Sequence, residues 1–396
     1  MVAEHRRGDA LPYGVFTTVD GSEAHVGVAV GEQVLDLTAI SAARRSPYAP
    51  LFETGSLDPL LRSGRPVWVA VRAQLRDWLA EHERGEPTMG AYLLGRGDVR
   101  MHLPFTVADY VDFYASEQHA STVGALFRPD GDPLPAAWRH LPMGYHGRAG
   151  SVIASGSNVP RPSGLLGQES GQAIFGRTAE LDFEAEVGFV VGTGSSRGTP
   201  VRLDDIREHV FGVVMVNDWS ARDIQGFEAR PLGPMLGKSF ATSISAWVLP
   251  LDALDAAHVA PPRRDPRPVA YLDDAEAEPW GLQLDLTISI NGTLVATPQY
   301  ATMYWTPAQM LAHLTVGGAA LRSGDLLASG TVSSQGEAGA GSLLERTTPG
   351  TPALTLDDGS KRTFLHDGDE VVITGSAPGA TGSRVMLGEV RGRITG

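Results

Sequence analysis

Glycine and proline are spread through this sequence so densely that most of the chain is expected to fold as short strands joined by turns. The 396 residues include 47 glycines and 27 prolines, about one residue in five, against about one in eight in ordinary globular proteins. Both residues break helices, and here they recur without the fixed period of collagen. The hydrophobic share of 42% is enough for a sizeable core. We therefore expect a mainly β protein with a few helices.

The pattern of apolar residues divides the chain into a small N-terminal unit, residues 1–104, and a larger C-terminal unit, residues 105–396. Strand-like runs and one helical pattern lie in the first unit, at 14–19, 24–30, 33–37 and 67–84. In the helical pattern Leu75, Trp78 and Leu79 fall on one stripe, as expected of an amphipathic helix.

The second unit has fewer helical patterns and more strand patterns. We expect a helix over 112–127, an alternating strand over 181–191, a buried strand over 211–216, a helix that begins at Thr306-Pro307, and strands and turns over 363–394. Residues 260–279 are rich in proline, arginine and aspartate and are expected to form an exposed connection.

Charge and composition exclude several classes of function. The chain has 32 Lys and Arg against 46 Asp and Glu, a formal net charge of −14, which opposes binding to nucleic acid or to an anionic membrane. Because cysteine is absent, any catalytic metal must bind oxygen or imidazole. No apolar run reaches the roughly 20 residues that span a bilayer. No targeting segment is visible, so the expected compartment is the cytoplasm.

Two glutamates two positions apart, Glu184 and Glu186, are the first residues that suggest chemistry. On a strand such residues point to the same face, and adjacent like charges are unfavourable unless a cation lies between them. A hard divalent ion with oxygen ligands meets that need. A solvated outer face is the alternative, although the apolar neighbours indicate a central strand. Asp218, which follows the predicted strand over 211–216, is expected to cap the next turn, to bind a metal ion, or to do both through different oxygens.

Asp112 and His119 are seven residues apart, which places them on one face of the helix predicted over 112–127. The polar neighbours of His119 suit a hydrogen-bonded site, although a single histidine is more often structural. Basic residues occur near these motifs, at Arg128, Arg148, Arg222 and Lys238. In so acidic a chain they suggest a small anionic substrate. Further hydroxyl donors are available from Tyr110, Tyr114 and Tyr145.

Longer motifs carry a resemblance to a known family. They read DFYASEQHA at 112–120, LPMGYHGR at 141–148, NDWSARDIQ at 217–225, PLGPMLGKSF at 231–240, GDLLASGT at 324–331 and DGDEV at 367–371. In this order they closely resemble the fumarylacetoacetate hydrolase family from about residue 105 to the end, and the small N-terminal unit fits the same layout. Several long motifs in one order are far more specific than a short pattern.

The resemblance implies a fold, an assembly and a reaction. The implied fold is a small SH3-like β-barrel over 1–104 followed by a large mixed β-sandwich roll over 105–396, in a homodimer. The implied reaction is hydrolysis of a carbon–carbon bond in 4-fumarylacetoacetate, a small dicarboxylate β-diketone. Its products are fumarate and acetoacetate, in the last step of tyrosine and phenylalanine degradation. The implied cofactor is Ca²⁺ or Mg²⁺, or both.

The resemblance also implies roles for individual residues. A catalytic divalent ion would be bound by Asp112, Glu184, Glu186 and Asp218. A second, structural Mg²⁺ would be bound by Asp218, Lys238 and Thr242, where lysine can offer only its backbone carbonyl. The general base would be His119, with Glu345 as its orienting partner. Substrate contacts would come from Tyr114, Arg128, Tyr145, Gln225 and Thr331. Hydrogen bonds to the developing carbanion would come from Arg222, Gln225 and Lys238.

Two positions depart from the family pattern. Where the family usually has a substrate-contacting tyrosine, in Gln-x-Trp-Glu-Tyr, this chain has Ala229, and after Lys-Ser-Phe it has Ala241 in place of glycine. The second change is minor because the backbone carbonyl remains. The change to Ala229 removes a predicted substrate contact, so the range of substrates stays open.

Two other functions also stay open. A related hydrolase or decarboxylase acting on another acylpyruvate or β-diketo acid would use the same metal site, although such relatives generally lack the N-terminal unit and the segment 112–119. A non-catalytic Ca²⁺-binding β-sandwich module would need the carboxylates, but it would have no use for His119 and Glu345.

Overall fold

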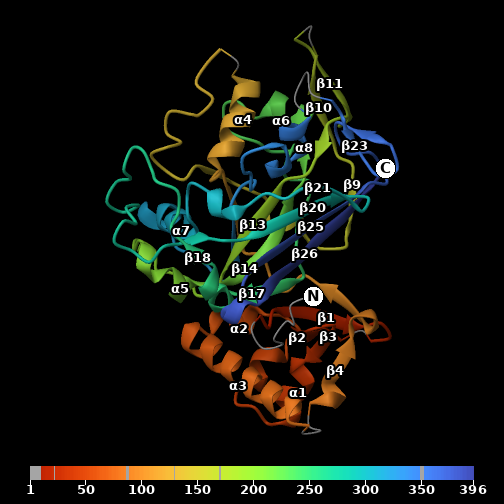
Figure 1. Ribbon diagram of the computed structural model, residues 1–396, viewed down its shortest axis with the longest axis vertical. Coiled ribbons are helices and arrows are strands. Elements are labelled where there is room, and N and C mark those ends of the chain that lie inside the picture. Colours follow the sequence, from red (N-terminus) through yellow and green to blue (C-terminus); the bar gives the residue numbers. More distant parts are fainter. Residues whose placement is uncertain (1–9, 22, 86–88, 129, 169–170, 348–351) are drawn as a thin grey trace.

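The structure is a computed structural model that describes residues 10–21, 23–85, 89–128, 130–168, 171–347 and 352–396. Its elements contain more strand than helix, as the many glycines and prolines predict (Figure 1). The α-helices are α1 (Leu37–Ala43), α2 (Asp58–Arg62), α3 (Arg65–Glu83), α4 (Glu117–Phe127), α5 (Ile206–His209), α6 (Arg222–Glu228), α7 (Pro307–Val316) and α8 (Leu343–Arg346). Among the described residues no helix is long and apolar enough to cross a membrane.

The N-terminal part of the chain packs short strands against α3. Its strands are β1 (Tyr13–Thr18), β2 (His25–Val30), β3 (Gln33–Asp36), β4 (Leu93–Gly95) and β5 (Val99–His102). Helix α3 was predicted from its apolar stripe and is confirmed, with Leu75, Trp78 and Leu79 all buried. It begins two residues earlier than predicted because Pro66 lies in its first turn, where a missing N–H is tolerated.

Helix α1 was not predicted. Leu37 begins this helix instead of ending a strand, because the Asp36 side chain caps it and accepts a hydrogen bond from the Ala39 amide at 2.9 Å. The one-turn helix α2 was missed for the same kind of reason, since five residues are too few to show a helical period.

Strands β1 to β5 do not close on themselves in the part of the chain that the structure describes. They pair in the order β4-β3-β2-β1, and β5 pairs with β1. The start of β1 instead pairs with β17 (Trp247–Pro250), with Tyr13 opposite Val248. No pairing between β4 and β5 is found among the described residues, so the SH3-like barrel is not detected. The strands extend the central sheet of the molecule.

That central sheet has thirteen strands within the described residues. Besides β1 to β5 and β17 it contains β6 (Asp109–Phe113), β7 (Gly144–His146), β8 (Val152–Ala154), β13 (Ala185–Val191), β14 (Val210–Asp218), β16 (Thr242–Ile244) and β22 (Asp325–Ala328). Every residue of β13 and β14 is buried, which is typical of strands covered on both faces. This confirms that Glu186 lies on a central strand.

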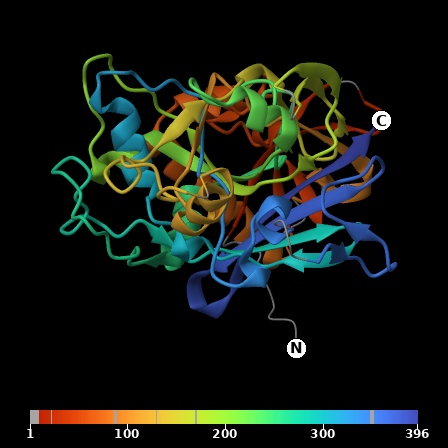
Figure 2. The same cartoon turned by 90° about the horizontal axis from the view of Figure 1, so that it is seen from above.

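A second, five-stranded sheet covers one face of the first. Its strands are β9 (Asn158–Pro160), β20 (Asp285–Ile290), β21 (Thr293–Ala296), β25 (Glu370–Pro378) and β26 (Arg384–Thr395). Figure 2 shows its cyan and blue strands side by side. Strands β25 and β26 pack on β14. A Cβ atom on Gly375 would lie 2.6 Å from Met215 Sδ, so the Met215 side chain would have to move to admit a larger residue between the two sheets.

Short two-stranded ribbons complete the described strands. They are β10 (Ser163–Gly167) with β11 (Ala173–Arg177), β12 (Leu181–Asp182) with β15 (Ser220–Ala221), β18 (His258–Val259) with β19 (Gly281–Leu282), and β23 (Leu354–Thr355) with β24 (Lys361–Arg362). The strand predicted over 181–191 is therefore two strands, β12 and β13, with Phe183 and Glu184 between them. Helix α7 begins with the predicted Thr306 cap, which forms a capping box with Gln309.

The helix predicted over 112–127 is wrong in its first part. Residues Asp109–Phe113 form strand β6, because they pair in parallel with β22 and antiparallel with β7. Helix α4 begins only at Glu117, where the Ser116 side chain accepts a hydrogen bond from the His119 amide at 3.2 Å. Asp112 and His119 therefore do not share a helix face. They belong to a strand and to the helix that follows it.

Candidate active site

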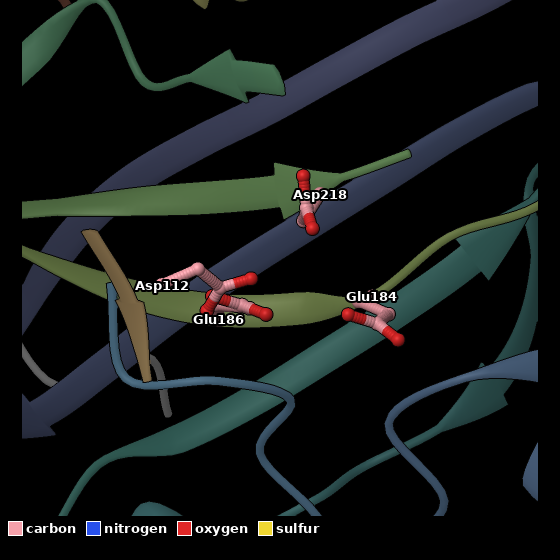
Figure 3. Close-up of side chains that lie close together, drawn as sticks. All are labelled: Asp112, Glu184, Glu186 and Asp218. Carbon is pink, nitrogen blue, oxygen red and sulfur yellow. The ribbon is translucent and has the colours of Figure 1, made fainter. Parts of the chain in front are cut away.

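Four carboxylates meet at the end of the central sheet. Asp112 lies on β6, Glu186 on β13 and Asp218 at the end of β14, and Glu184 directly precedes β13. All four side chains are buried. One oxygen from each carboxylate can be chosen so that the four oxygens lie within 4.8 Å of one another (Figure 3). Glu186 sits opposite Val216 across β13 and β14. The sheet register therefore brings together residues that are far apart in the sequence.

Two of these carboxylates have oxygens without a hydrogen-bond partner within the described part of the chain. No hydrogen bond reaches Asp112 Oδ1 or either oxygen of Glu186. Burial and the neighbouring carboxylates raise the pKa of Asp112 and the pKa of Glu186 well above their usual values. Buried, unpaired carboxylate oxygens are costly, and a divalent cation with oxygen ligands would satisfy them. The donor set thus fits a hard metal ion.

The other two carboxylates are paired with cations. Glu184 lies 2.6 Å from Arg222 Nη1 and 2.5 Å from Lys238 Nζ. Lys238 Nζ also lies 2.7 Å from Asp218. Burial alone would raise the pKa of Glu184, but Lys238 and Arg222 hold that pKa well below its usual value. Glu184 is therefore charged, and it links the carboxylate cluster to two buried cations.

Asp218 also accepts two hydroxyl hydrogen bonds. Tyr145 donates to Oδ2 at 2.8 Å and Thr242 donates to Oδ1 at 2.9 Å. Thr242 lies on β16, which pairs with β14 so that Thr242 is opposite Asp218. The Asp218 carboxylate is thus fixed on both oxygens, and it stands beside Asp112 and Glu186, whose oxygens are available to a metal ion.

His119 and Glu345 form a buried acid–base pair. His119 Nδ1 lies 2.9 Å from Glu345 Oε2, and both side chains are 4% exposed. The other ring nitrogen, Nε2, lies 3.9 Å from Glu184 Oε1. Hydroxyl groups of Ser333 and Ser342 donate to Glu345 Oε2 at 2.9 and 3.0 Å. The histidine therefore has one nitrogen against a fixed carboxylate and the other toward the carboxylate cluster.

A cavity of about 640 Å³ collects most of the residues that the sequence singled out. Its lining includes Asp112, Tyr114, His119, Arg128, Tyr145, Glu184, Arg222, Gln225, Lys238 and Thr331. Four predicted site residues are outside that lining. Glu186 and Asp218 complete the carboxylate cluster, Thr242 bonds Asp218, and Glu345 contacts His119. Arg148 lines a neighbouring cavity of about 400 Å³ that shares Tyr145 and Lys238.

The polar groups of the cavity differ in how they are held. Thr331 Oγ1 is buried, and no partner for it is found among the described residues, so it can bond a ligand. Arg222 Nη1 donates to Gln225 Oε1 at 3.2 Å, so the Gln225 amide nitrogen does not take part in this contact. Arg128 donates to the backbone carbonyls of Asp132 and Pro133. Its guanidinium is therefore anchored to its own loop at the cavity wall.

Three residues that support this arrangement were missed. Ser333 and Ser342 bond Glu345, and Asp182, which is fully buried, bonds Arg222. The signal for Asp182 was present in the sequence, because carboxylates alternate at 182, 184 and 186. No local pattern marks the two serines.

Comparison with known families gives matches along nearly the whole chain. The model described as fumarylacetoacetase N-terminal matches residues 9–104, and the model described as fumarylacetoacetate (FAA) hydrolase C-terminal matches residues 109–395. The chain belongs to the fumarylacetoacetase family. It is 40% identical to fumarylacetoacetase of Mus musculus over 399 residues, which cover 97% of this chain and 94% of the mouse protein. Fumarylacetoacetase of Arabidopsis thaliana is 39% identical over 398 residues, with the same coverage.

Solved structures share the fold of this fumarylacetoacetase family member at lower identity. Fumarylacetoacetate hydrolase of Exiguobacterium antarcticum has a TM-score of 0.56 at 17% identity and covers 97% of this chain and 99% of its own. Maleylpyruvate hydrolase of Sphingobium sp. SYK-6, in complex with a manganese(II) ion and pyruvate, has a TM-score of 0.50 at 14% identity, with the same coverage. These likenesses support the fold alone.

Ala229, the position at which the resemblance described above predicts a tyrosine, faces the cavity. Ala229 is the C-cap residue that follows α6, and it lines the cavity together with Arg230, Leu232 and Pro234. Leu232 is 96% exposed. The side chain that lines the cavity at position 229 is therefore a single methyl group.

Proposed function

We propose that this enzyme hydrolyses 4-fumarylacetoacetate to fumarate and acetoacetate, the last step of tyrosine and phenylalanine degradation. The observation that carries the proposal is one cavity in which the His119–Glu345 pair meets a buried four-carboxylate cluster. The cavity belongs to a chain that matches curated fumarylacetoacetases along 97% of its length. The substrate is a β-diketone with a carboxylate at each end, which suits a cavity that contains both a cation site and basic side chains.

The proposed metal ion is Ca²⁺ or Mg²⁺, bound by Asp112, Glu184, Glu186 and Asp218. A second Mg²⁺ at Asp218, Lys238 and Thr242 follows from the family resemblance. When bound, the ion supplies Lewis-acid polarisation of the diketone oxygens. The unpartnered oxygens of Asp112 and Glu186 support this assignment.

His119 is the proposed general base. Its Nε2 atom accepts a proton from a water molecule, and the resulting hydroxide oxygen bonds to the carbonyl carbon of the substrate. Glu345, 2.9 Å from Nδ1, orients the imidazole and stabilises its positive charge. The burial of this pair supports the role, because a low-dielectric surrounding strengthens the interaction between the two side chains.

Arg222, Gln225 and Lys238 are the proposed hydrogen-bond donors to the leaving group. When the carbon–carbon bond breaks, its electron pair goes to the acetoacetate carbon, and the proton held by His119 is returned there. Preorganised donors at the point where negative charge develops lower the barrier to this step. The carboxylate ends of the substrate are assigned to Tyr114, Arg128, Tyr145 and Thr331, which line the same cavity.

Two candidate functions compete with this proposal. The first is hydrolysis of another acylpyruvate or β-diketo acid; the Sphingobium protein, for example, is a maleylpyruvate hydrolase. A non-catalytic Ca²⁺ module is the second. Loss of the diketone ultraviolet absorbance, followed for a panel of diketo acids with and without chelator, separates all three. Fastest loss with fumarylacetoacetate, abolished by chelator, is expected; metal binding without turnover of any panel member would overturn the proposal.

We further propose a homodimer and two units that meet at residues 104 and 105. The two family models support the boundary, since they end and begin on either side of it. Exposed apolar side chains support self-association, notably Phe175, Leu232 and Met235. The SH3-like barrel stays a prediction for the first unit, and the β-sandwich roll for the second is supported by the two packed sheets. Light scattering of the purified enzyme tests the dimer, and a monomeric mass at micromolar concentration would contradict it.

Ala229 offers a test of substrate specificity. Replacing Ala229 by tyrosine adds a hydroxyl donor and fills part of the cavity wall. A hydrogen bond to a charged carboxylate contributes roughly 1.5–3 kcal/mol, so KM for fumarylacetoacetate is expected to fall about ten- to a hundredfold. Larger acyl analogues should bind less well. Steady-state kinetics on short and bulky diketo acids measure both effects, and an unchanged preference would show that this position does not set specificity.

A further inference from the structure

Asp182 is a buried carboxylate outside the metal cluster that nevertheless reaches two parts of the catalytic machinery. It is fully buried on β12. Its Oδ2 atom accepts hydrogen bonds from Arg222 Nε at 2.9 Å and Nη2 at 2.8 Å. The same oxygen accepts from the Leu344 amide at 3.0 Å, and Oδ1 accepts from the amides of Phe183 at 2.7 Å and Leu343 at 2.8 Å.

These bonds hold the first turn of helix α8, which carries Glu345. Ser342 is the residue at the N-cap position of α8, but its side chain makes no capping hydrogen bond. Its hydroxyl instead donates to Glu345. Asp182 supplies the missing cap from another strand, since it accepts from the first two amides of the helix. A carboxylate at this place also interacts favourably with the helix dipole.

The same carboxylate ends a buried row of alternating charges. Asp182 pairs with Arg222, Arg222 with Glu184, Glu184 with Lys238, and Lys238 with Asp218, at distances between 2.5 and 2.8 Å. Arg222 is 3% exposed at its side chain, so its guanidinium depends on protein partners. Removing Asp182 would leave this row with two negative and two positive groups, and two N–H groups of the Arg222 guanidinium would lose their acceptor.

We propose that Asp182 is a positioning residue. It fixes the position of the Arg222 guanidinium and that of Glu345, and through Glu345 it orients the His119 imidazole. This inference rests on the proposed function, because it concerns how that site is assembled. Asp182 touches neither the cavity nor the carboxylate cluster. It therefore affects turnover indirectly, by positioning the groups that line the cavity or act within it.

Asparagine cannot reproduce these contacts. One oxygen of Asp182 faces two guanidinium N–H groups and a backbone amide, and the other faces two backbone amides. The amide nitrogen of asparagine is a donor, so in either orientation it would face donors. Either the first turn of α8 or the Arg222 guanidinium must shift, and a shift near 1 Å can lower the rate of a reaction by about a hundredfold.

The chain offers a matched control in Asp369. This aspartate is also buried, and it accepts hydrogen bonds from Arg362 Nε at 2.7 Å and Nη2 at 2.8 Å. It further accepts from the His366 amide at 2.7 Å and from Asn291 at 2.8 Å. It lies just before β25, and it does not line the cavity described above. Asp369→Asn therefore reproduces the loss of a buried Asp–Arg pair without touching the site.

The experiment compares Asp182→Asn with Asp369→Asn in the full-length, metal-loaded enzyme. Both variants are expected to have a lower thermal midpoint. Asp182→Asn should lower kcat by about 10- to 100-fold with KM within about threefold, whereas Asp369→Asn should keep kcat within about twofold of wild type. Equal kcat values for the two variants would overturn the proposal. Loss of the fold in Asp182→Asn and also in the smaller Asp182→Ser would assign the residue to the fold and overturn it as well.

Two further readouts distinguish positioning from general loosening. In a double-mutant cycle with Glu345→Gln, the combined loss of kcat should be smaller than the product of the single losses, because the residues act as a unit; a multiplicative loss contradicts the proposal. A crystal structure of Asp182→Asn should show Glu345 moved from His119 or Arg222 moved from Glu184. This second readout needs no activity, so an unchanged site would overturn the positioning role even if fumarylacetoacetate proved not to be the substrate.

Discussion

Replacing His119 by asparagine is expected to lower kcat by about 10²- to 10⁴-fold, the usual contribution of a general base. Asparagine keeps a polar side chain of similar size but cannot accept and return a proton. The His119 ring is buried between Glu345 and Glu184, and among the described residues it is the only histidine in the lining of this cavity. Single-turnover kinetics with fumarylacetoacetate measure the effect on the chemical step.

His313 provides the control for this substitution. It lies on α7, where its Nδ1 atom is 2.9 Å from the Tyr271 hydroxyl, and it does not line the cavity. His313→Asn should leave kcat nearly unchanged. Glu345→Gln should resemble His119→Asn, and the two losses should not multiply because the pair acts as a unit. Retention of most of the turnover in His119→Asn would show that another group is the base.

Removing the metal ion is expected to abolish turnover and to lower the thermal midpoint, and added Ca²⁺ or Mg²⁺ should restore both. An ion that binds only the folded chain stabilises it by about 2.7 kcal/mol at a concentration one hundred times its Kd. Glu184→Gln and Asp218→Asn should weaken metal binding, but both also break ion pairs with Lys238. Glu186→Gln is the cleaner variant, because neither Glu186 oxygen has a partner among the described residues.

Glu186→Gln should separate metal binding from folding. It removes a buried carboxyl group whose charged form is disfavoured by burial and by the neighbouring Asp112 and Asp218, so the metal-free variant should be at least as stable as metal-free wild type. Its midpoint should no longer rise with Ca²⁺. Asp325→Asn, at another buried aspartate outside the cluster, should keep the full metal response. Wild-type turnover that survives exhaustive chelation, or an unchanged calcium response in Glu186→Gln, would refute the metal site.

The sequence predicted the candidate site better than the local structure around it. Glu184, Glu186 and Asp218 were recognisable because strand periodicity and strand ends are local properties. Asp112 was assigned to a helix, because its strand character comes from pairing with β22, more than two hundred residues later. Long-range pairing of this kind leaves little trace in the residues around one position.

Supporting contacts were harder to predict for the same reason. Helix α8 has four residues, too few to show a period, and its cap comes from Asp182 on a distant strand. The continuation of the N-terminal sheet into β17 was likewise not predictable, because β17 belongs to the C-terminal part of the chain. The motifs identified the family, but they did not show which buried side chains hold the catalytic side chains in place.

The pairing of β1 with β17 also affects how the chain folds during synthesis. Tyr13 pairs with Val248, so the ribosome must add more than two hundred residues before the partner of β1 exists. At about 5–20 residues per second, that interval is on the order of ten to fifty seconds. For that time the first residues of β1 present an unpaired backbone edge, which other nascent chains could join. The N-terminal sheet can therefore reach its final arrangement only late in translation.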